Sequence, residues 1–284
     1  MPVLLKRTLT TLTLWAAIIA LLYFAGAHAA VWMVCLMAVV SVLEFNKLTR
    51  AIGHRPFSKM SAVLAGLMIV VPFYAAIWFP KIGVTTPDLL MVGVIAAAVR
   101  TLGERDPGTR VGALASTLFA LVYVPFMVSY FVRIIADHTA PCASSGVLLF
   151  VWVVIVTKLC DTGALLTGMA CGRHKMSPVI SPKKTWEGFV GGIIISALIS
   201  ALFAWLFARW LPADFTPLFA ALVALPLAVI GVAGDLVESV IKRRAGIKDS
   251  GRLAPGIGGM FDLTDSLILT APAAFWLLRL MRLA

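Results

Sequence analysis

Acidic and basic side chains are concentrated in one stretch of the chain, residues 234–266. Five of the thirteen carboxylates lie in it, together with five lysine or arginine side chains, although most of the remaining sequence is apolar. These residues are Asp235, Glu238, Asp249, Asp262 and Asp265, with Lys242, Arg243, Arg244, Lys248 and Arg252. Ionised groups beside a lipid bilayer are costly unless they bind something, so this cluster is a candidate functional site.

Two helices are expected to bring these carboxylates together. Polar residues recur at helical spacing along one face of the first helix: Asp235, Glu238, Ser239, Lys242 and Arg243. After a turn rich in glycine and proline, Asp262 and Asp265 open the next helix on one face. Carboxylates from two helices at one depth suit a metal site for a phosphate substrate. The alternative is a set of salt bridges that ties the two helices together, and spacing alone leaves both open.

A second polar constellation lies upstream, in residues 158–192. Lys158 and Asp161 are three residues apart inside an apolar helix, where each charge costs roughly 2.5–3.5 kcal/mol on insertion scales. This pair is either an internal salt bridge or part of a site.

The segment SPKKTWEG continues this constellation. Hydroxyl and ammonium groups converge there at an expected helix amino terminus: Ser181, Lys183, Lys184 and Thr185. This arrangement predicts an anion-binding cradle. The alternative is a positively charged membrane anchor with Trp186 at the interface. The sequence contains no GxxxxGK[ST] motif, which argues against a P-loop enzyme.

The composition indicates an all-α, polytopic membrane protein. The chain is 61% hydrophobic and 13% charged, and its mean hydropathy is +1.00. Apolar runs approach the roughly 20 residues that a membrane-spanning helix needs. About nine spans are predicted: 9–27, 31–45, 61–79, 89–102, 112–135, 146–170, 188–210, 217–237 and 263–280.

The charge distribution predicts the orientation of these spans. With the amino terminus in the cytoplasm, eighteen lysines and arginines fall in cytoplasmic segments and five on the opposite face, which satisfies the positive-inside rule. Loops 171–187 and 238–262 are then cytoplasmic. The net charge of +11 follows from this topology and from attraction to anionic lipids, so no nucleic-acid partner is expected. We expect one continuous membrane domain, with scaffold helices in residues 1–145 and a catalytic region in 146–284.

Ordered motifs carry a specific resemblance to a known family. The motif segments are Ser239-Val-Ile-Lys242-Arg243, Gly246-Ile-Lys248-Asp249, Pro255-Gly-Ile257-Gly-Gly259 and Asp262-Leu263-Thr-Asp265, preceded by GDLVES, DTGA and SPKKTWEGF. Over residues 146–270 the chain resembles the integral membrane phosphatidate cytidylyltransferases, also called CDP-diacylglycerol synthases. It departs from the family pattern at Ile257, where the family has His, and at Leu263, where it has Arg. Roles of those two side chains do not carry over.

The resemblance implies an activity and a set of roles. Phosphatidate attacks the α-phosphorus of CTP, which gives CDP-diacylglycerol and pyrophosphate for phospholipid biosynthesis. Asp235, Asp262 and Asp265 are expected to hold Mg²⁺, with a second, monovalent cation left open, and Lys248 and Asp249 are expected to be catalytic. The residues expected to bind substrate are Asp161, Ser181, Lys183, Lys184, Thr185, Ser239, Lys242 and Arg243.

The resemblance also implies partners and a location. The expected partners are CTP, phosphatidate and the bilayer, and a homodimer is compatible with the family. The expected location is the inner (plasma) membrane, with the active site facing the cytoplasm. Two other functions stay open: a CTP-dependent kinase of a polyprenol or similar lipid alcohol, and a transporter that uses the intramembrane charges. The departures at Ile257 and Leu263 leave an altered activity open.

Overall fold

Apolar runs with few charges satisfy their backbone hydrogen bonds internally as helices, and the structure confirms the predicted all-α membrane class. The computed structural model describes residues 3–104, 106–136, 145–251 and 258–281, with side chains from residue 19 onward. The elements are α1 (Val3–Ala51), α2 (Ser58–Trp78), α3 (Thr86–Leu102), α4 (Pro107–Leu121), the π-helical turn η1 (Val122–Phe126), α5 (Met127–Ile135), α6 (Ser145–Cys171), β1 (Lys175–Ser177), β2 (Ser181–Thr185), α7 (Trp186–Leu206), α8 (Pro217–Ala245) and α9 (Met260–Met281).

The number of spans differs from the prediction of about nine. Among the described residues, seven helices are long and apolar enough to cross a membrane. The predicted spans 9–27 and 31–45 both lie in α1, whose backbone is non-helical at Gly26, where φ is 52° and ψ is −129°, close to the predicted break between the two spans. The count of seven includes this segment once, from Ile19 to Ala51, because the side chains before residue 19 are not described. The predicted span 89–102 is α3, whose 17 residues fall short of the roughly 20 that cross the hydrocarbon core without adjustment.

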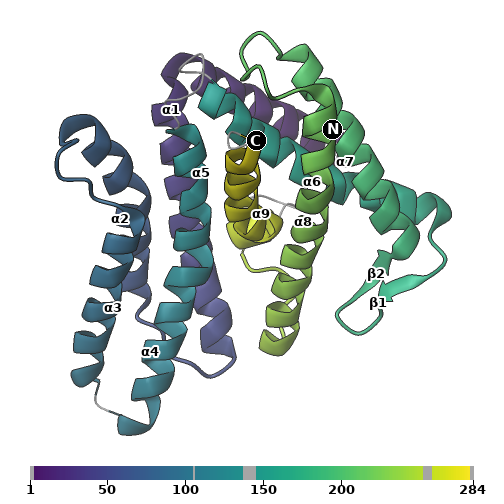
Figure 1. The fold of residues 1–284 in the computed structure, drawn as a ribbon. Helices are drawn as coiled ribbons and strands as arrows, with labels where there is room; N and C mark the ends of the chain where they lie inside the picture. The colour runs from purple at the N-terminus through teal and green to yellow at the C-terminus, as the bar shows by residue number, and fades with distance from the viewer. Residues whose placement is uncertain (1–2, 105, 137–144, 252–257, 282–284) are drawn as a thin grey trace.

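Helix α9 lies at the centre of the arrangement and contacts α1, α5, α6 and α8. Figure 1 shows it between α5 and α8. Its hydroxyl side chains are buried and bonded to neighbouring helices: Thr264 lies 2.8 Å from the Ser41 hydroxyl of α1, and Thr270 lies 3.5 Å from the Thr157 hydroxyl of α6. Any side chain at the start of α9 is therefore held in register with several other helices.

Glycines allow α6 and α7 to pack closely. A Cβ atom at Gly188 would lie 2.6 Å from the carbonyl oxygen of Ala164, and one at Gly192 would lie 2.7 Å from that of Cys160. These distances are too short for a side chain, so the two backbones meet directly, as small residues permit in membrane helices. This packing holds the carboxyl end of α6 against the amino end of α7.

The predicted cytoplasmic loop 171–187 is in fact a β-hairpin. Strands β1 and β2 pair antiparallel, with Lys175 opposite Thr185 and Ser177 opposite Ser181. The hairpin projects beyond the ends of α6 and α7 (Figure 1). Its last residue, Thr185, caps α7 by accepting a hydrogen bond from the Gly188 amide at 3.1 Å.

Candidate functional site

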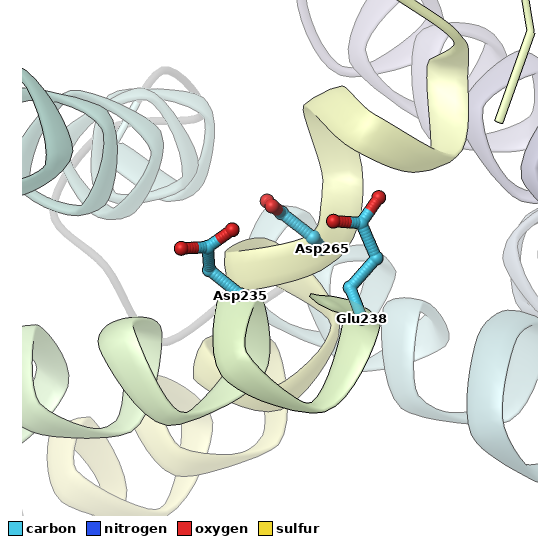
Figure 2. A group of neighbouring side chains, drawn as sticks. All are labelled: Asp235, Glu238 and Asp265. Atoms are coloured by element: carbon cyan, nitrogen blue, oxygen red, sulfur yellow. The ribbon is translucent and has the colours of Figure 1, made fainter. Parts of the chain in front are cut away.

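Three carboxylates from two helices meet where α8 crosses the start of α9. Asp235 and Glu238 come from α8 and Asp265 from α9. Each offers an oxygen that lies within 4.8 Å of the others, and Figure 2 shows the three groups turned toward one another. The Glu238 side chain is 1% exposed and that of Asp265 is 8% exposed. We call Asp235, Glu238 and Asp265 the carboxylate cluster.

A glycine explains why these two helices come so close. A Cβ atom at Gly234 would lie 2.7 Å from the carbonyl oxygen of Asp265 and 3.1 Å from the Cα of Ser266. Without a side chain there, the backbone of α8 rests on the backbone of α9 directly beside the cluster. The prediction that the two helices present carboxylates at one depth therefore has a structural basis in Gly234.

Lys242 and Asp262 form a second contact between α8 and the start of α9. The Lys242 ammonium lies 2.7 Å from Glu238 Oε2 and 3.0 Å from Asp262 Oδ1. Asp262 also accepts hydrogen bonds from the backbone amides of Ser250, at 3.1 Å, and Gly259, at 2.7 Å. Asp262 thus fastens the loop before α9 and lies outside the carboxylate cluster, although the sequence predicted it as a metal ligand together with Asp235 and Asp265.

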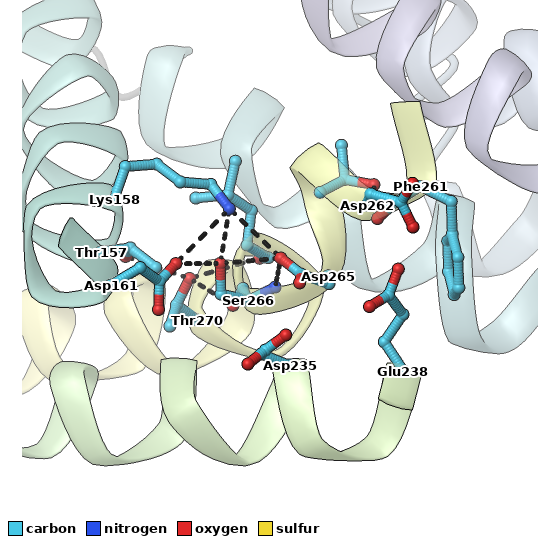
Figure 3. A network of polar contacts seen from close by, with 12 residues as sticks. Thr157, Lys158, Asp161, Asp235, Glu238, Phe261, Asp262, Asp265, Ser266 and Thr270 are labelled. Atoms are coloured by element: carbon cyan, nitrogen blue, oxygen red, sulfur yellow. Dashed lines mark hydrogen bonds and ion pairs between the residues drawn. The ribbon is translucent and has the colours of Figure 1, made fainter. Parts of the chain in front are cut away.

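Lys158 connects α6 to the same region. Its ammonium donates to Ser266 Oγ at 2.8 Å and to Asp265 Oδ1 at 3.2 Å, and it lies 3.7 Å from Asp161 Oδ2. Figure 3 shows these contacts converging on the lysine. The internal salt bridge considered for Lys158 and Asp161 is therefore present, but Lys158 also reaches α9.

A cavity of about 280 Å³ opens between the carboxylates and the hairpin. Its polar lining is Lys158, Asp161, Lys183, Lys184, Thr185, Asp235, Asp262 and Asp265. Its apolar lining includes Leu165, Phe189 and Val232. Lys184 forms an ion pair with Asp235, and Lys183 is exposed. The predicted anion cradle and the predicted carboxylates thus face one another across a single cavity.

Six of the residues expected from the sequence lie away from this cavity lining, among them Lys242, which is paired with Glu238 and Asp262. Ser181 is at the far end of β2, Ser239 is on α8, and Arg243 donates to the carbonyl oxygen of Ile180 at 3.3 Å. Lys248 and Asp249 are exposed on the segment after α8. Leu263 is a half-buried residue of α9. The remaining motif positions, Arg252, Pro255 and Ile257, lie outside the described residues.

Glu44 of α1 is a polar residue of this region that the motifs do not reveal. Its side chain accepts hydrogen bonds from the Ser250 hydroxyl, at 2.9 Å, and from the Phe261 amide, at 2.8 Å. A Cβ atom at Gly251 would collide with Glu44 Oε1, and one at Gly259 would collide with Oε2, so two glycines make room for this carboxylate. The one signal for Glu44 in the sequence is that this carboxylate lies within an apolar run.

The carboxylate cluster fits a hard divalent cation. Carboxylate oxygens are the ligands that Mg²⁺ and similar ions prefer. Glu238 adds a specific sign: its two oxygens are buried and accept no well-aligned hydrogen bond from the described residues, despite the nearby Lys242. A buried carboxylate without such partners is costly, and a metal ion would satisfy it.

Comparison with known proteins identifies the family. A protein of Staphylococcus haemolyticus named phosphatidate cytidylyltransferase is 30% identical over 268 residues, which are 94% of this chain and 95% of the relative. A protein of the same name from Mycobacterium bovis is 33% identical over 80% of this chain and 66% of its own length. Another, from Synechocystis, is 29% identical over 91% and 89%. The sequence model described as the cytidylyltransferase family matches residues 5–281, and the chain belongs to that family.

Proposed function

We propose that this protein transfers the cytidylyl group of CTP to phosphatidate, giving CDP-diacylglycerol and pyrophosphate, at the cavity between the carboxylate cluster and the hairpin. One observation carries the proposal most directly: carboxylates of α8 and α9 and lysines of β2 line the same cavity in a member of the cytidylyltransferase family. The curated relatives of similar length bear the name of this activity.

The chemistry requires two polyanions to approach each other. An oxygen of the phosphatidate phosphate forms a bond to the α-phosphorus of CTP, and the bond from that phosphorus to the bridging oxygen of the β-phosphate breaks. The electron pair leaves with pyrophosphate. The attacking phosphate is already an anion at neutral pH, so no strong general base is needed. Positioning and charge neutralisation are therefore the main tasks of the protein.

The residues of the cavity can perform these tasks. We propose that Lys183 binds a phosphate group directly, since its ammonium is exposed at the cavity. Lys184 is paired with Asp235 and would exchange that carboxylate for a substrate phosphate. The apolar wall at Leu165, Phe189 and Val232 suits the lipid portion of phosphatidate. Lys248, Asp249, Arg243, Ser239 and Ser181 stay predicted contributors at the edge of the site.

Asp235, Glu238 and Asp265 would hold the divalent cation, with Mg²⁺ as the ion we propose. Such an ion neutralises phosphate charge and orients the triphosphate when it is bound. Asp262 keeps the loop residues Ser250 and Gly259 in place beside this group. We therefore assign Asp262 a positioning role, and Glu238 takes its place in the ligand set.

We further propose that the hairpin end of the bundle faces the cytoplasm in an inner or plasma membrane. The excess of lysine and arginine in the segments at this end supports that orientation. The division into scaffold helices before residue 146 and a catalytic region after it is also a proposal, with Glu44 as a scaffold residue that reaches the site. A homodimer stays a prediction.

Labelled CTP tests the proposed reaction. Purified protein in detergent is given phosphatidate, Mg²⁺ and CTP labelled at either the α- or the γ-phosphate, and the lipid phase is extracted. We expect α-label in the lipid and release of pyrophosphate. Transfer of γ-label to an isoprenoid alcohol would instead indicate a lipid kinase. Absence of both labels from the lipid phase would contradict the proposal and would direct attention to Ile257 and Leu263.

A further inference from the structure

The ammonium group of Lys158 is surrounded by oxygen atoms, as a bound metal cation would be. Its ammonium lies among oxygen atoms of two helices: Ser266 Oγ at 2.8 Å, Asp265 Oδ1 at 3.2 Å and Asp161 Oδ2 at 3.7 Å. The side chain crosses from α6 to α9 to reach them (Figure 3). A lysine inside an apolar span costs roughly 2.5–3.5 kcal/mol on insertion scales, so its contacts must offset that cost.

The charges of the region show what Lys158 does. The described ion pairs join five carboxylates, namely Asp161, Asp235, Glu238, Asp262 and Asp265, to three ammonium groups, namely Lys158, Lys184 and Lys242. The exposed Lys183, which also lines the cavity, is outside these ion pairs; with every paired group ionised, two negative charges are left over within them. That excess equals the charge of one divalent cation. Without Lys158, the excess would be three, and Asp161 and Asp265 would lack their shared positive partner.

The two carboxylate oxygens of Asp265 have different surroundings. Its described hydrogen bonds all go to Oδ1, from Lys158, from the Ser266 hydroxyl at 3.0 Å and from the Ser266 amide at 2.5 Å. Oδ2 accepts none from the described residues, so it is left for an ion in the carboxylate cluster. Asp265 could therefore serve as the partner of Lys158 and also as one of the residues that would hold the ion.

We infer that Lys158 is a built-in cation of this centre, so that the site takes a single divalent ion at Asp235, Glu238 and Asp265 and needs no second metal ion beside Asp161. This inference deepens the proposed function and rests on it for the meaning of the site. The metal count itself can be measured without CTP or lipid. Lys158 is a positioning residue in this account, because it acts through Asp265 and Asp161.

Counting bound Mn²⁺ by electron paramagnetic resonance tests the inference. Full-length protein in detergent is titrated with Mn²⁺ in a buffer free of sodium and potassium, so that neither of these ions can bind beside Asp161 and Asp265 in place of Mn²⁺. We expect about one Mn²⁺ per chain in the wild type. Lys158→Met keeps an unbranched side chain of similar size but removes its charge, and we expect this variant to bind about two Mn²⁺ ions, with a spin-coupled signal.

Matched variants separate this effect from general damage. Lys81→Met makes the same change in the exposed turn between α2 and α3 and should bind one Mn²⁺, as should Lys158→Arg, which keeps the charge. Lys158→Gln replaces Lys158→Met if the latter does not elute as a folded monodisperse species.

Two results would overturn the inference: two Mn²⁺ per wild-type chain, or one Mn²⁺ with unchanged affinity in a folded Lys158→Met or Lys158→Gln variant. A chain that binds one Mn²⁺ in the wild type and two in Lys158→Met, yet transfers no cytidylyl group, would refute the proposed function and not the role of Lys158. A wild-type protein that transfers the cytidylyl group but binds two Mn²⁺ ions would refute the role of Lys158 and not the proposed function.

Discussion

At the scale of single residues, the carboxylates at the start of α9 and on α8 differ in what their oxygen atoms contact. Asp235, Glu238 and Asp265 present oxygens to one another, whereas Asp262 is bonded to Lys242 and to two backbone amides. Because their partners differ, we propose different roles for these carboxylates. Substitutions that keep shape and remove charge can tell the two groups apart.

Glu238→Gln should weaken divalent-cation binding by at least about tenfold, because it removes a charged ligand that is buried and poorly hydrogen-bonded. Mn²⁺ titration of the purified protein measures the change. Glu104→Gln, in the turn between α3 and α4, is the matched control and should bind as the wild type does. If Asp262→Asn weakens binding and Glu238→Gln does not, the ligand set expected from the sequence is the correct one.

Sequence reasoning reached part of this site and missed part for identifiable reasons. Asp235 and Asp265 stand in dense motifs on expected helices, so their meeting was predictable. Glu238 lies one turn from Asp235 on the same face, and that spacing was a usable signal for a third ligand. Glu44 lies more than 200 residues from Ser250 in the chain, and no local pattern predicts that contact.

At the scale of elements, close packing of backbones sets the geometry of the site. Helix α8 approaches α9 at Gly234, one residue before Asp235, and α6 approaches α7 at Gly188 and Gly192. The loop before α9 is held from two sides, by Glu44 of α1 and by Asp262 of α9. The site is therefore sensitive to residues that carry no reactive group.

Gly234→Ala should reduce both metal affinity and cytidylyl transfer, because the new Cβ would lie 2.7 Å from the carbonyl oxygen of Asp265 and would push α8 away from α9. Metal titration and α-label transfer measure the two effects. Gly66→Ala, another helical glycine whose Cβ would meet Val39 at an ordinary 3.5 Å, is the control. Wild-type affinity and activity in Gly234→Ala would show that this contact does not set the site.

Glu44→Gln should lower the free energy of unfolding by about 1–3 kcal/mol, because a buried charged acceptor of two hydrogen bonds is replaced by a neutral one. It should also lower transfer activity more than metal affinity, since Glu44 contacts the loop and not the carboxylate cluster. Thermal unfolding in detergent, metal titration and α-label transfer together check this. Equal losses of affinity and activity would contradict the separation of the two roles.

At the scale of the whole molecule, the sequence predicts the all-α membrane fold class better than it predicts the number of membrane-spanning helices. Apolar runs reliably predict membrane helices, yet seven spans and not about nine are counted among the described residues, because α3 is short and α1 is counted once, from Ile19 onward. The kink at Gly26 lies close to the predicted break between spans 9–27 and 31–45. The hairpin at residues 175–185 was likewise expected to be a loop.

The fold as a whole joins a lipid-facing bundle to a charged cavity at its hairpin end. The proposed cytidylyl transfer to phosphatidate would require a lipid phosphate to reach this cavity from the bilayer and a nucleotide to reach it from the water. The most direct test compares transfer of label from α-labelled CTP to phosphatidate by the wild type, by Asp235→Asn and by Asp214→Asn, an exposed control between α7 and α8. We predict transfer by the wild type and by Asp214→Asn, and a loss of at least about 100-fold in folded Asp235→Asn. Equal transfer by all three proteins would contradict the assignment of the carboxylate cluster, and transfer by none would contradict the proposed activity.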